Sequence, residues 1–227
     1  MSRKQIVTVA VIILLLLGGA AYYLTSRAPS DAVAPAADGF LAPDRISPAD
    51  KAMGNPGAPI TMIEYFAQIC SVCARFDQEV FPLLKAKYID TGKVRYVMRI
   101  YPIRPLDQPS YRLDLCVPPD HFFQSVDLLF RNQPLWDAEE YPVSDPHGEL
   151  IKMARIMGLT PEQAEACMNS TAQDAAINQA AQEATARYNI EGTPTFVIDF
   201  KKVDMGQKTW DEVQRALDAA LAAKGVK

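Results

Sequence analysis

The sequence has no excess of basic residues and very few histidines. It carries 23 Lys and Arg against 27 Asp and Glu, which gives a formal net charge of −4 over 227 residues. Proteins that bind phosphate backbones need clustered Lys and Arg to displace counterions, so no nucleic-acid partner is expected. The only histidines are His121 and His147, and neither an H-x-x-H nor a second C-x-x-C is present. The chain therefore lacks the usual ligand set of a structural zinc site, and we expect no cofactor.

No internal repeat is visible, and the length is awkward for two domains. At 227 residues the chain exceeds a typical single domain of roughly 100–150 residues, yet falls short of two. Hydrophobic residues make up 49% and charged residues 22%, which is an ordinary globular balance. One hydrophobic core with an insertion is the natural expectation.

An apolar segment lies close to the N-terminus. Residues 6–24 carry no charge and follow two basic residues. The run approaches the ~20 residues that span a bilayer and ends in a tyrosine pair, which favours an uncleaved anchor in the inner membrane. A cleaved signal peptide is the alternative, because residues 6–17 have the length of an h-region and small residues follow. Both interpretations predict a periplasmic or other extracytoplasmic location, where four cysteines indicate a disulfide system.

Composition then divides the chain into three parts. Residues 1–27 form the anchor or signal peptide, residues 28–50 an Ala- and Pro-rich linker, and residues 51–227 the folded domain. The linker shows no apolar periodicity, so it need not pack. Within the domain, about 107–188 contains helical patterns without a strand signal, which predicts a helical insertion.

The domain opens with a strand, a helix and a second strand. Residues 60–66 and 94–100 are short runs rich in β-branched and aromatic side chains, which is typical of buried strands. Between them, apolar residues recur at helical spacing after Cys70, and Pro82 is expected to kink the helix. This order predicts an α/β sheet.

Further elements follow in the second half of the chain. Asp120 is expected to cap one helix of the insertion, and Thr160 to begin another with a capping box. Strand character returns at residues 194–199, followed by a polar turn and an amphipathic helix from Trp210 onward.

The motif Cys70-Ser71-Val72-Cys73 lies where the first strand leads into the helix. Unpaired N–H groups and the positive end of the helix dipole favour a thiolate at Cys70. A lowered pKa makes Cys70 both a better nucleophile and a better leaving group, while Cys73 can attack a mixed disulfide. Half of a zinc or copper site is the alternative interpretation.

More than a hundred residues later, a proline stands directly before a strand in Glu191-Gly192-Thr193-Pro194-Thr195-Phe196. Together with the C-x-x-C, this motif resembles the thioredoxin superfamily. The long helical insertion and the segments "CSVCARFDQEVFPLL", "YIDTGKVRYVMRIYPI" and "GTPTFVID" are similar to its DsbA branch. The resemblance covers about 58–221. It implies a thioredoxin fold whose helical insertion caps the active site, and a cis Pro194 with Thr193 beside the redox sulfurs.

The resemblance also implies a role for Glu64, which precedes Cys70 on the buried strand. Superfamily members often keep an acidic residue beneath the disulfide, and burial raises the pKa of such a group. Glu64 is therefore a candidate proton acceptor for Cys73, although an edge position in solvent is the alternative. The chain departs from the family between the cysteines, where strong oxidants have C-P-H-C. Ser71 and Val72 in these positions leave the oxidising strength open.

Cys116 and Cys167 have no partner at motif spacing. Each can be a small buried hydrophobe. In an exported domain, two leftover thiols are more often joined, and some DsbA-like proteins carry a second bridge in their helical part. We therefore expect a structural disulfide between Cys116 and Cys167.

These patterns predict a thiol-disulfide oxidoreductase with Cys70, Cys73 and Glu64 as catalytic residues. Ser71, Val72, Thr193 and Pro194 are expected to contact the substrates, which are unfolded or partly folded exported proteins. Contact with the membrane through the N-terminal segment is expected, and a membrane redox partner is left open. The alternatives are a disulfide reductase or isomerase, and a copper chaperone that grips Cu(I) through the two thiolates.

Overall fold

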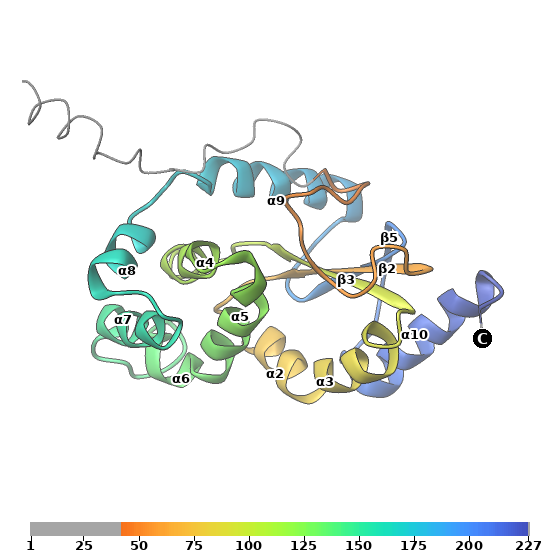
Figure 1. The fold of residues 1–227 in the computed structure, drawn as a ribbon, viewed down its shortest axis with the longest axis horizontal. Helices are drawn as coiled ribbons and strands as arrows, with labels where there is room; N and C mark the ends of the chain where they lie inside the picture. The colour runs from red at the N-terminus through yellow and green to blue at the C-terminus, as the bar shows by residue number, and fades with distance from the viewer. Residues whose placement is uncertain (1–41, 227) are drawn as a thin grey trace, which may run out of the picture. The chain divides into compact units, whose positions relative to one another are not determined.

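The computed structural model describes residues 42–226, and its centre is a five-stranded sheet (Figure 1). The strand order is β1-β3-β2-β4-β5, with β2 and β3 parallel and the other neighbours antiparallel. The strands are β1 (Lys51–Met53), β2 (Ile60–Phe66), β3 (Val94–Ile100), β4 (Thr195–Ile198) and β5 (Lys201–Val203). The α/β class and the thioredoxin fold with inserted helices are confirmed.

Helices cover both faces of the sheet. Figure 1 shows α9 on one side and α2, α3 and α10 on the other. The helical elements are α2 (Ser71–Glu79), α3 (Phe81–Leu84), η1 (Lys85–Ile89), α4 (Asp107–Cys116), η2 (Pro119–His121), α5 (Phe122–Arg131), α6 (Gln133–Trp136), α7 (Pro146–Ile156), α8 (Pro161–Met168), α9 (Asp174–Tyr188) and α10 (Trp210–Ala223). Elements α4 to α9 lie between β3 and β4, so they form the insertion into the thioredoxin fold.

The alternation of side chains along β2 divides the core into two clusters. Met62 and Phe66 join the larger cluster, which includes residues of α2, α5 and α10. Ile63 and Tyr65 point to the opposite face and pack with Tyr188 of α9. Both faces of the strand are therefore buried, which explains its nearly continuous apolar sequence.

The predicted strands over 60–66 and 94–100 are confirmed, and the third is shortened to Thr195–Ile198. The structure adds β1 and β5, each of three residues, at the two edges of the sheet. The sequence predicts a polar turn where β5 lies. Strands this short show too little alternation to be recognised.

Pro82 ends the first helix rather than kinking it. Helix α2 stops at Glu79, and Pro82 lies in the first turn of α3, followed by the π-helix η1. A proline has no N–H to donate, and this is harmless in the first turn of a helix, where N–H groups lack intrahelical partners.

One predicted cap is confirmed and one is wrong. Thr160 forms a capping box with Gln163 at the start of α8. Asp120, by contrast, lies in the short 3-10 helix η2, and α5 begins after His121 without a side-chain cap. The proline pair before Asp120 starts a separate 3-10 turn, which moves the aspartate away from the cap position.

The end of the predicted linker is packed against the domain. The buried Arg99 of β3 forms an ion pair with Asp50, 2.8 Å between Nε and Oδ1. Its guanidinium also donates to the carbonyl oxygens of Ala42 and Arg45, at 3.1 and 2.7 Å. A buried arginine needs several acceptors, and residues 42–50 supply them. This packing differs from the tether that the sequence predicts over residues 28–50.

The predicted membrane segment, residues 6–24, lies outside the described residues. None of the helices between residues 42 and 226 combines the length and the apolar character that crossing a membrane requires.

Candidate active site

Cys70 is the N-cap residue of α2, directly after the loop that leaves β2. Its backbone is extended, with φ −80° and ψ 108°, and its sulfur accepts a hydrogen bond from the Cys73 N–H at 3.2 Å. The first turn of a helix has N–H groups without intrahelical partners. The helix start therefore directs N–H donors at the Cys70 sulfur.

The two cysteine sulfurs differ strongly in acidity. A hydrogen bond from the Cys73 thiol is the main reason that the pKa of Cys70 is lowered to about 6. Partial burial acts in the opposite direction, and a contact with Thr193 and hydrogen bonds from the Cys73 and Val72 N–H groups lower the pKa further. Burial and the hydrogen bond to Cys70 raise the pKa of Cys73 well above its ordinary value. At neutral pH, Cys70 is mainly a thiolate and Cys73 remains a thiol.

The loop before β4 lies against the first sulfur. The Thr193-Pro194 peptide bond is cis, as the family resemblance implies. The Cys70 thiol donates to the Thr193 carbonyl oxygen at 3.3 Å. The Thr193 hydroxyl oxygen is buried and has no hydrogen-bond partner among the described residues, so it is available to donate to a thiolate.

Glu64 lies on β2 and is 1% exposed, so the edge position in solvent is wrong. The Tyr96 hydroxyl donates to one of its carboxyl oxygens, and the other oxygen has no partner within residues 42–226. Burial is the main cause that raises the pKa of Glu64 to about 8, and the charges of Asp77 and Cys70 raise it further. The Glu64 charge in turn raises the pKa of Cys73, which places the carboxyl within electrostatic reach of that thiol.

Asp77 is a second carboxyl near this site that the sequence analysis missed. Burial, followed by a hydrogen bond with Asp127 of α5, raises the pKa of Asp77 to about 8. Asp77 stands four residues after Cys73 on α2, so the two residues lie on the same face of the helix. This i, i+4 spacing was the signal available in the sequence.

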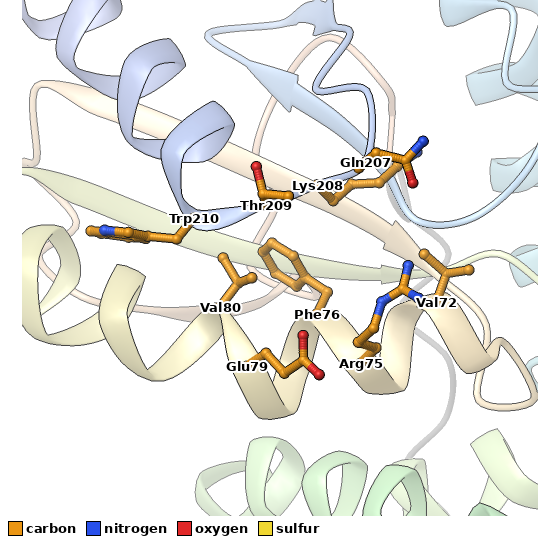
Figure 2. Close-up of a pocket in the computed structure, with 9 residues that line it drawn as sticks. All are labelled: Val72, Arg75, Phe76, Glu79, Val80, Gln207, Lys208, Thr209 and Trp210. Atoms are coloured by element: carbon orange, nitrogen blue, oxygen red, sulfur yellow. The ribbon is translucent and has the colours of Figure 1, made fainter.

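Two grooves are lined by residues that adjoin the redox pair, Val72 in one and the Thr193-Pro194 loop in the other. The first, drawn in Figure 2, has a volume of about 380 Å³ and lies between α2 and the loop that enters α10. Val72 and Arg75 line it on the α2 side, and Lys208 and Trp210 on the other. The second groove, of about 300 Å³, is lined by the Thr193-Pro194 loop, β5 and again Lys208. Ser71 is exposed at the start of α2.

Cys116 and Cys167 form a disulfide that joins α4 to α8, with 6.1 Å between their Cα atoms. Cys70 and Cys73 are free thiols. The disulfide therefore lies within the insertion, apart from the C-x-x-C.

Three buried polar residues of the insertion hold the loop before Cys70, and the sequence analysis missed them as well. They are Asp107, Asp114 and Gln133. No local pattern marks them, because their partners, Gln68 and Ile69, lie in the loop after β2 and are brought close only by the tertiary fold.

Comparison with known proteins supports this architecture. A family model described as thioredoxin matches residues 47–219, and the chain therefore belongs to the thioredoxin family. Its fold is DsbA-like. The crystal structure of Wolbachia pipientis alpha-DsbA1 is 28% identical, with a TM-score of 0.69 over 78% of this chain and 94% of that one. BdbD from Bacillus subtilis, 22% identical with a TM-score of 0.65 over 76% and 93% of the two chains, shares the fold.

Curated relatives are similar over much of the chain. A Rickettsia typhi protein with the provisional name protein-disulfide oxidoreductase is 29% identical over 76% of this chain. The match covers only 62% of that protein's length. Disulfide bond formation protein D of Bacillus subtilis is 26% identical over 76% of this chain and 77% of its own.

Proposed function

We propose that this chain is an enzyme that exchanges disulfides with other proteins through Cys70 and Cys73. The observation that carries the proposal is the inequality of the two sulfurs. Cys70 has a pKa lowered to about 6 at a helix start, whereas burial holds the pKa of Cys73 well above its ordinary value. Thiol-disulfide exchange needs one sulfur that is attacked and leaves as a thiolate, and a second that resolves the intermediate.

The oxidised enzyme acts in two steps. A substrate thiolate attacks the Cys70 sulfur, the Cys70–Cys73 bond breaks, and Cys73 leaves as a thiolate. A second substrate thiolate then attacks the substrate sulfur of the mixed disulfide, so that the substrate gains a disulfide and Cys70 leaves as a thiolate. Two electrons pass from the substrate to the enzyme, which leaves Cys70 and Cys73 reduced.

Glu64 is the proton donor and acceptor for Cys73 in this scheme. Because the pKa of Glu64 is raised to about 8, its carboxyl is mainly protonated at neutral pH and can give its proton to the Cys73 thiolate. In the reverse reaction the Glu64 carboxylate takes the proton from Cys73, which then attacks the mixed disulfide at Cys70.

The substrates we propose are unfolded or partly folded exported proteins. Both grooves are open to solvent and share Lys208 in their linings, and one includes Val72 and the other the Thr193-Pro194 loop, which suits an extended polypeptide. Ser71 and Val72 at the start of α2 and the Thr193-Pro194 loop would contact the chain on either side of its cysteine. The names of the relatives, which refer to protein disulfides, support this substrate class.

We also propose an extracytoplasmic location, with residues 6–24 as an anchor in the inner membrane. The Cys116–Cys167 disulfide supports an oxidising compartment, since such bonds are rare in a reducing cytosol. A membrane protein that restores the oxidised Cys70–Cys73 pair is a natural partner of an anchored enzyme.

The test is the equilibrium reduction potential of the Cys70–Cys73 pair, set beside two activity assays. The wild-type protein should oxidise a reduced, unfolded protein, and Cys70→Ser should not. Asp211→Asn, an exposed change on α10, is the neutral control and should retain this activity. Insulin reduction faster than substrate oxidation would favour a reductase or isomerase. Cu(I) retained after dialysis by wild type but not by Cys73→Ser would favour the copper chaperone. The complete burial of Cys73 argues against that alternative, because a metal bridging both sulfurs needs room at each.

A further inference from the structure

The loop that leads into Cys70 is buried although it contains polar groups. Ala67, Gln68 and Ile69 are each 1% exposed, and we call these three residues the redox loop. Buried N–H, C=O and amide groups need hydrogen-bond partners. Its own turn satisfies one of them, since the Cys70 N–H donates to the Ala67 carbonyl oxygen at 3.1 Å.

The helical insertion supplies partners for three further groups of the loop, whereas the Gln68 side-chain oxygen has none among residues 42–226. The Ile69 N–H donates to the Asp107 carboxylate at 2.9 Å, and the Gln133 side-chain amide donates to the Gln68 carbonyl oxygen at 2.6 Å. The Gln68 side-chain amide donates to the Asp114 carboxylate. The three insertion residues are themselves 1–2% exposed. Main chain and side chain of the redox loop are therefore both bonded to the insertion.

Asp107 also fastens a second segment. Its other carboxyl oxygen accepts the N–H groups of Ile103 and Arg104, at 2.8 and 3.0 Å, in the stretch that follows β3. One carboxylate thus accepts three N–H groups and fixes the redox loop relative to the start of α4. Charge-assisted hydrogen bonds of this kind are stronger than neutral ones.

The position of the Cys70 sulfur depends on how the chain enters α2. The sulfur accepts the Cys73 N–H at 3.2 Å, and Cys70 directly follows Ile69, whose N–H is held by Asp107. Hydrogen bonds weaken steeply as the donor and acceptor move out of line. A small rotation of the Ile69-Cys70 peptide would therefore weaken the interactions that stabilise the Cys70 thiolate.

We propose that Asp107, Asp114 and Gln133 are positioning residues, through which the helical insertion sets the reactivity of Cys70. This inference rests on the proposed function of Cys70 as the sulfur that the substrate attacks and that leaves as a thiolate. It gives the insertion a role in the chemistry in addition to covering the site.

The sharpest test compares two substitutions of Asp114. Asp114→Asn keeps an oxygen that can accept from Gln68, whereas Asp114→Leu removes the acceptor at similar volume. The pKa of Cys70 is measured from the thiolate absorbance near 240 nm and from the pH dependence of alkylation. We expect Asp114→Leu to raise that pKa by about 0.5–1 unit, which makes alkylation at pH 5 roughly three- to tenfold slower. Asp114→Asn should stay close to wild type.

A double variant separates positioning from general damage to the insertion. Gln68→Met removes the other side of the same hydrogen bond, so Gln68→Met/Asp114→Leu should shift the pKa of Cys70 no further than either single change. Additive shifts would contradict a shared contact. Asp107→Asn should also raise the pKa of Cys70, because Asn offers one oxygen in place of the carboxylate that accepts three N–H groups. Gln133→Leu should do the same, because it removes the donor to the Gln68 carbonyl oxygen.

Asp137→Asn is the matched control. Asp137 is a buried acid of the same insertion, 1% exposed, and its carboxylate accepts from the Glu139 N–H, outside the redox loop. It should lower the melting temperature without changing the pKa of Cys70. If Asp107→Asn or Asp114→Leu fails to fold, Gln68→Met carries the same test.

The outcomes distinguish this inference from the proposed function. Folded variants of Asp107, Asp114 and Gln68 that keep the wild-type pKa of Cys70 would overturn the positioning role while leaving disulfide exchange intact. If the variants shift the pKa of Cys70 but the wild-type protein shows no exchange activity, only the proposed function is overturned.

Discussion

The thiol of Cys70 lies 3.3 Å from the carbonyl oxygen of Thr193, although 123 residues separate them in sequence. This contact joins the start of α2 to the cis Thr193-Pro194 loop before β4. It places the peptide group of the loop beside the sulfur that reacts in our proposal. A substrate that pairs with this loop would therefore bring its own cysteine to Cys70.

The acidity of Cys70 predicts a selective reaction. In the reduced protein, iodoacetamide should modify Cys70 with a half-maximal rate near pH 6, following its pKa of about 6, and should leave Cys73 unmodified. Because the thiolate is the nucleophile, the rate rises with pH through this value and then levels off. Peptide mapping of alkylated protein across pH 4–9 measures both sites. Preferential alkylation of Cys73, or a rate that rises only near the ~8.5 of an ordinary thiol, would contradict the assignment.

Glu64 should make stability depend on pH. Its pKa is raised from the ordinary 4.5 to about 8, so between these values the folded chain keeps a proton that the unfolded chain has lost. The free energy of unfolding therefore falls as pH rises through this window. Glu64→Gln, which cannot ionise, should be more stable than wild type by roughly 2–4 kcal/mol at pH 8 and nearly equal to it at pH 4.

Urea unfolding at several pH values checks this prediction. Glu183→Gln, an exposed change on α9, is the control and should follow wild type across the range. A stability gain of Glu64→Gln that is the same at pH 4 and pH 8 would show that proton binding is not its cause.

Several parts of this architecture follow from the sequence and others do not. Strands β2 and β3 were predictable because each is a seven-residue run rich in β-branched and aromatic side chains, and the C-x-x-C is recognisable from spacing alone. The hydrogen-bond partners of Gln68 were not predictable, because no local pattern in the sequence distinguishes a buried glutamine from an exposed one. For the same reason Arg99 gave no hint that it holds residues 42–50. Polar groups that are satisfied through tertiary contacts leave no periodic signal.

The second disulfide should stabilise the insertion. Cys116 and Cys167 are 51 residues apart, and closing a loop of this length in the unfolded chain contributes about 4 kcal/mol in the chain-entropy model. The double change Cys116→Ala/Cys167→Ala should therefore lower the free energy of unfolding by about this amount, measured in urea. Differential alkylation should show that mild reductant opens Cys70–Cys73 first. An unchanged unfolding midpoint would show that the bridge contributes no stability.

The dipeptide between the cysteines predicts a moderate oxidant. The pKa of Cys70 is lowered only to about 6, against about 3.5 for the nucleophile of DsbA, whose potential is near −120 mV. At about 30 mV per pKa unit of thiolate stabilisation, the potential should lie roughly 70 mV lower, near that of protein disulfide isomerase. Val72→His should raise it, because a histidine can donate a hydrogen bond or carry a positive charge beside the thiolate.

A glutathione titration followed by tryptophan fluorescence measures this potential. Val72→Leu is the control for side-chain size and should stay close to wild type. A wild-type value as high as that of DsbA, or a Val72→His variant that is more reducing, would refute the argument.

The Arg99 contacts have a mechanical consequence. A pull on the chain from the N-terminal side would first load the hydrogen bonds of residues 42–50, among them those from Arg99 to Ala42 and Arg45 and from Tyr188 to Pro43. The force would then enter the molecule through β3 and α9. The three-residue edge strand β1, which follows Asp50, would be shielded from peeling until the buried ion pair gave way. A pull on the N-terminal side of the chain would thus be borne by residues 42–50 before it reached the sheet that carries the redox pair.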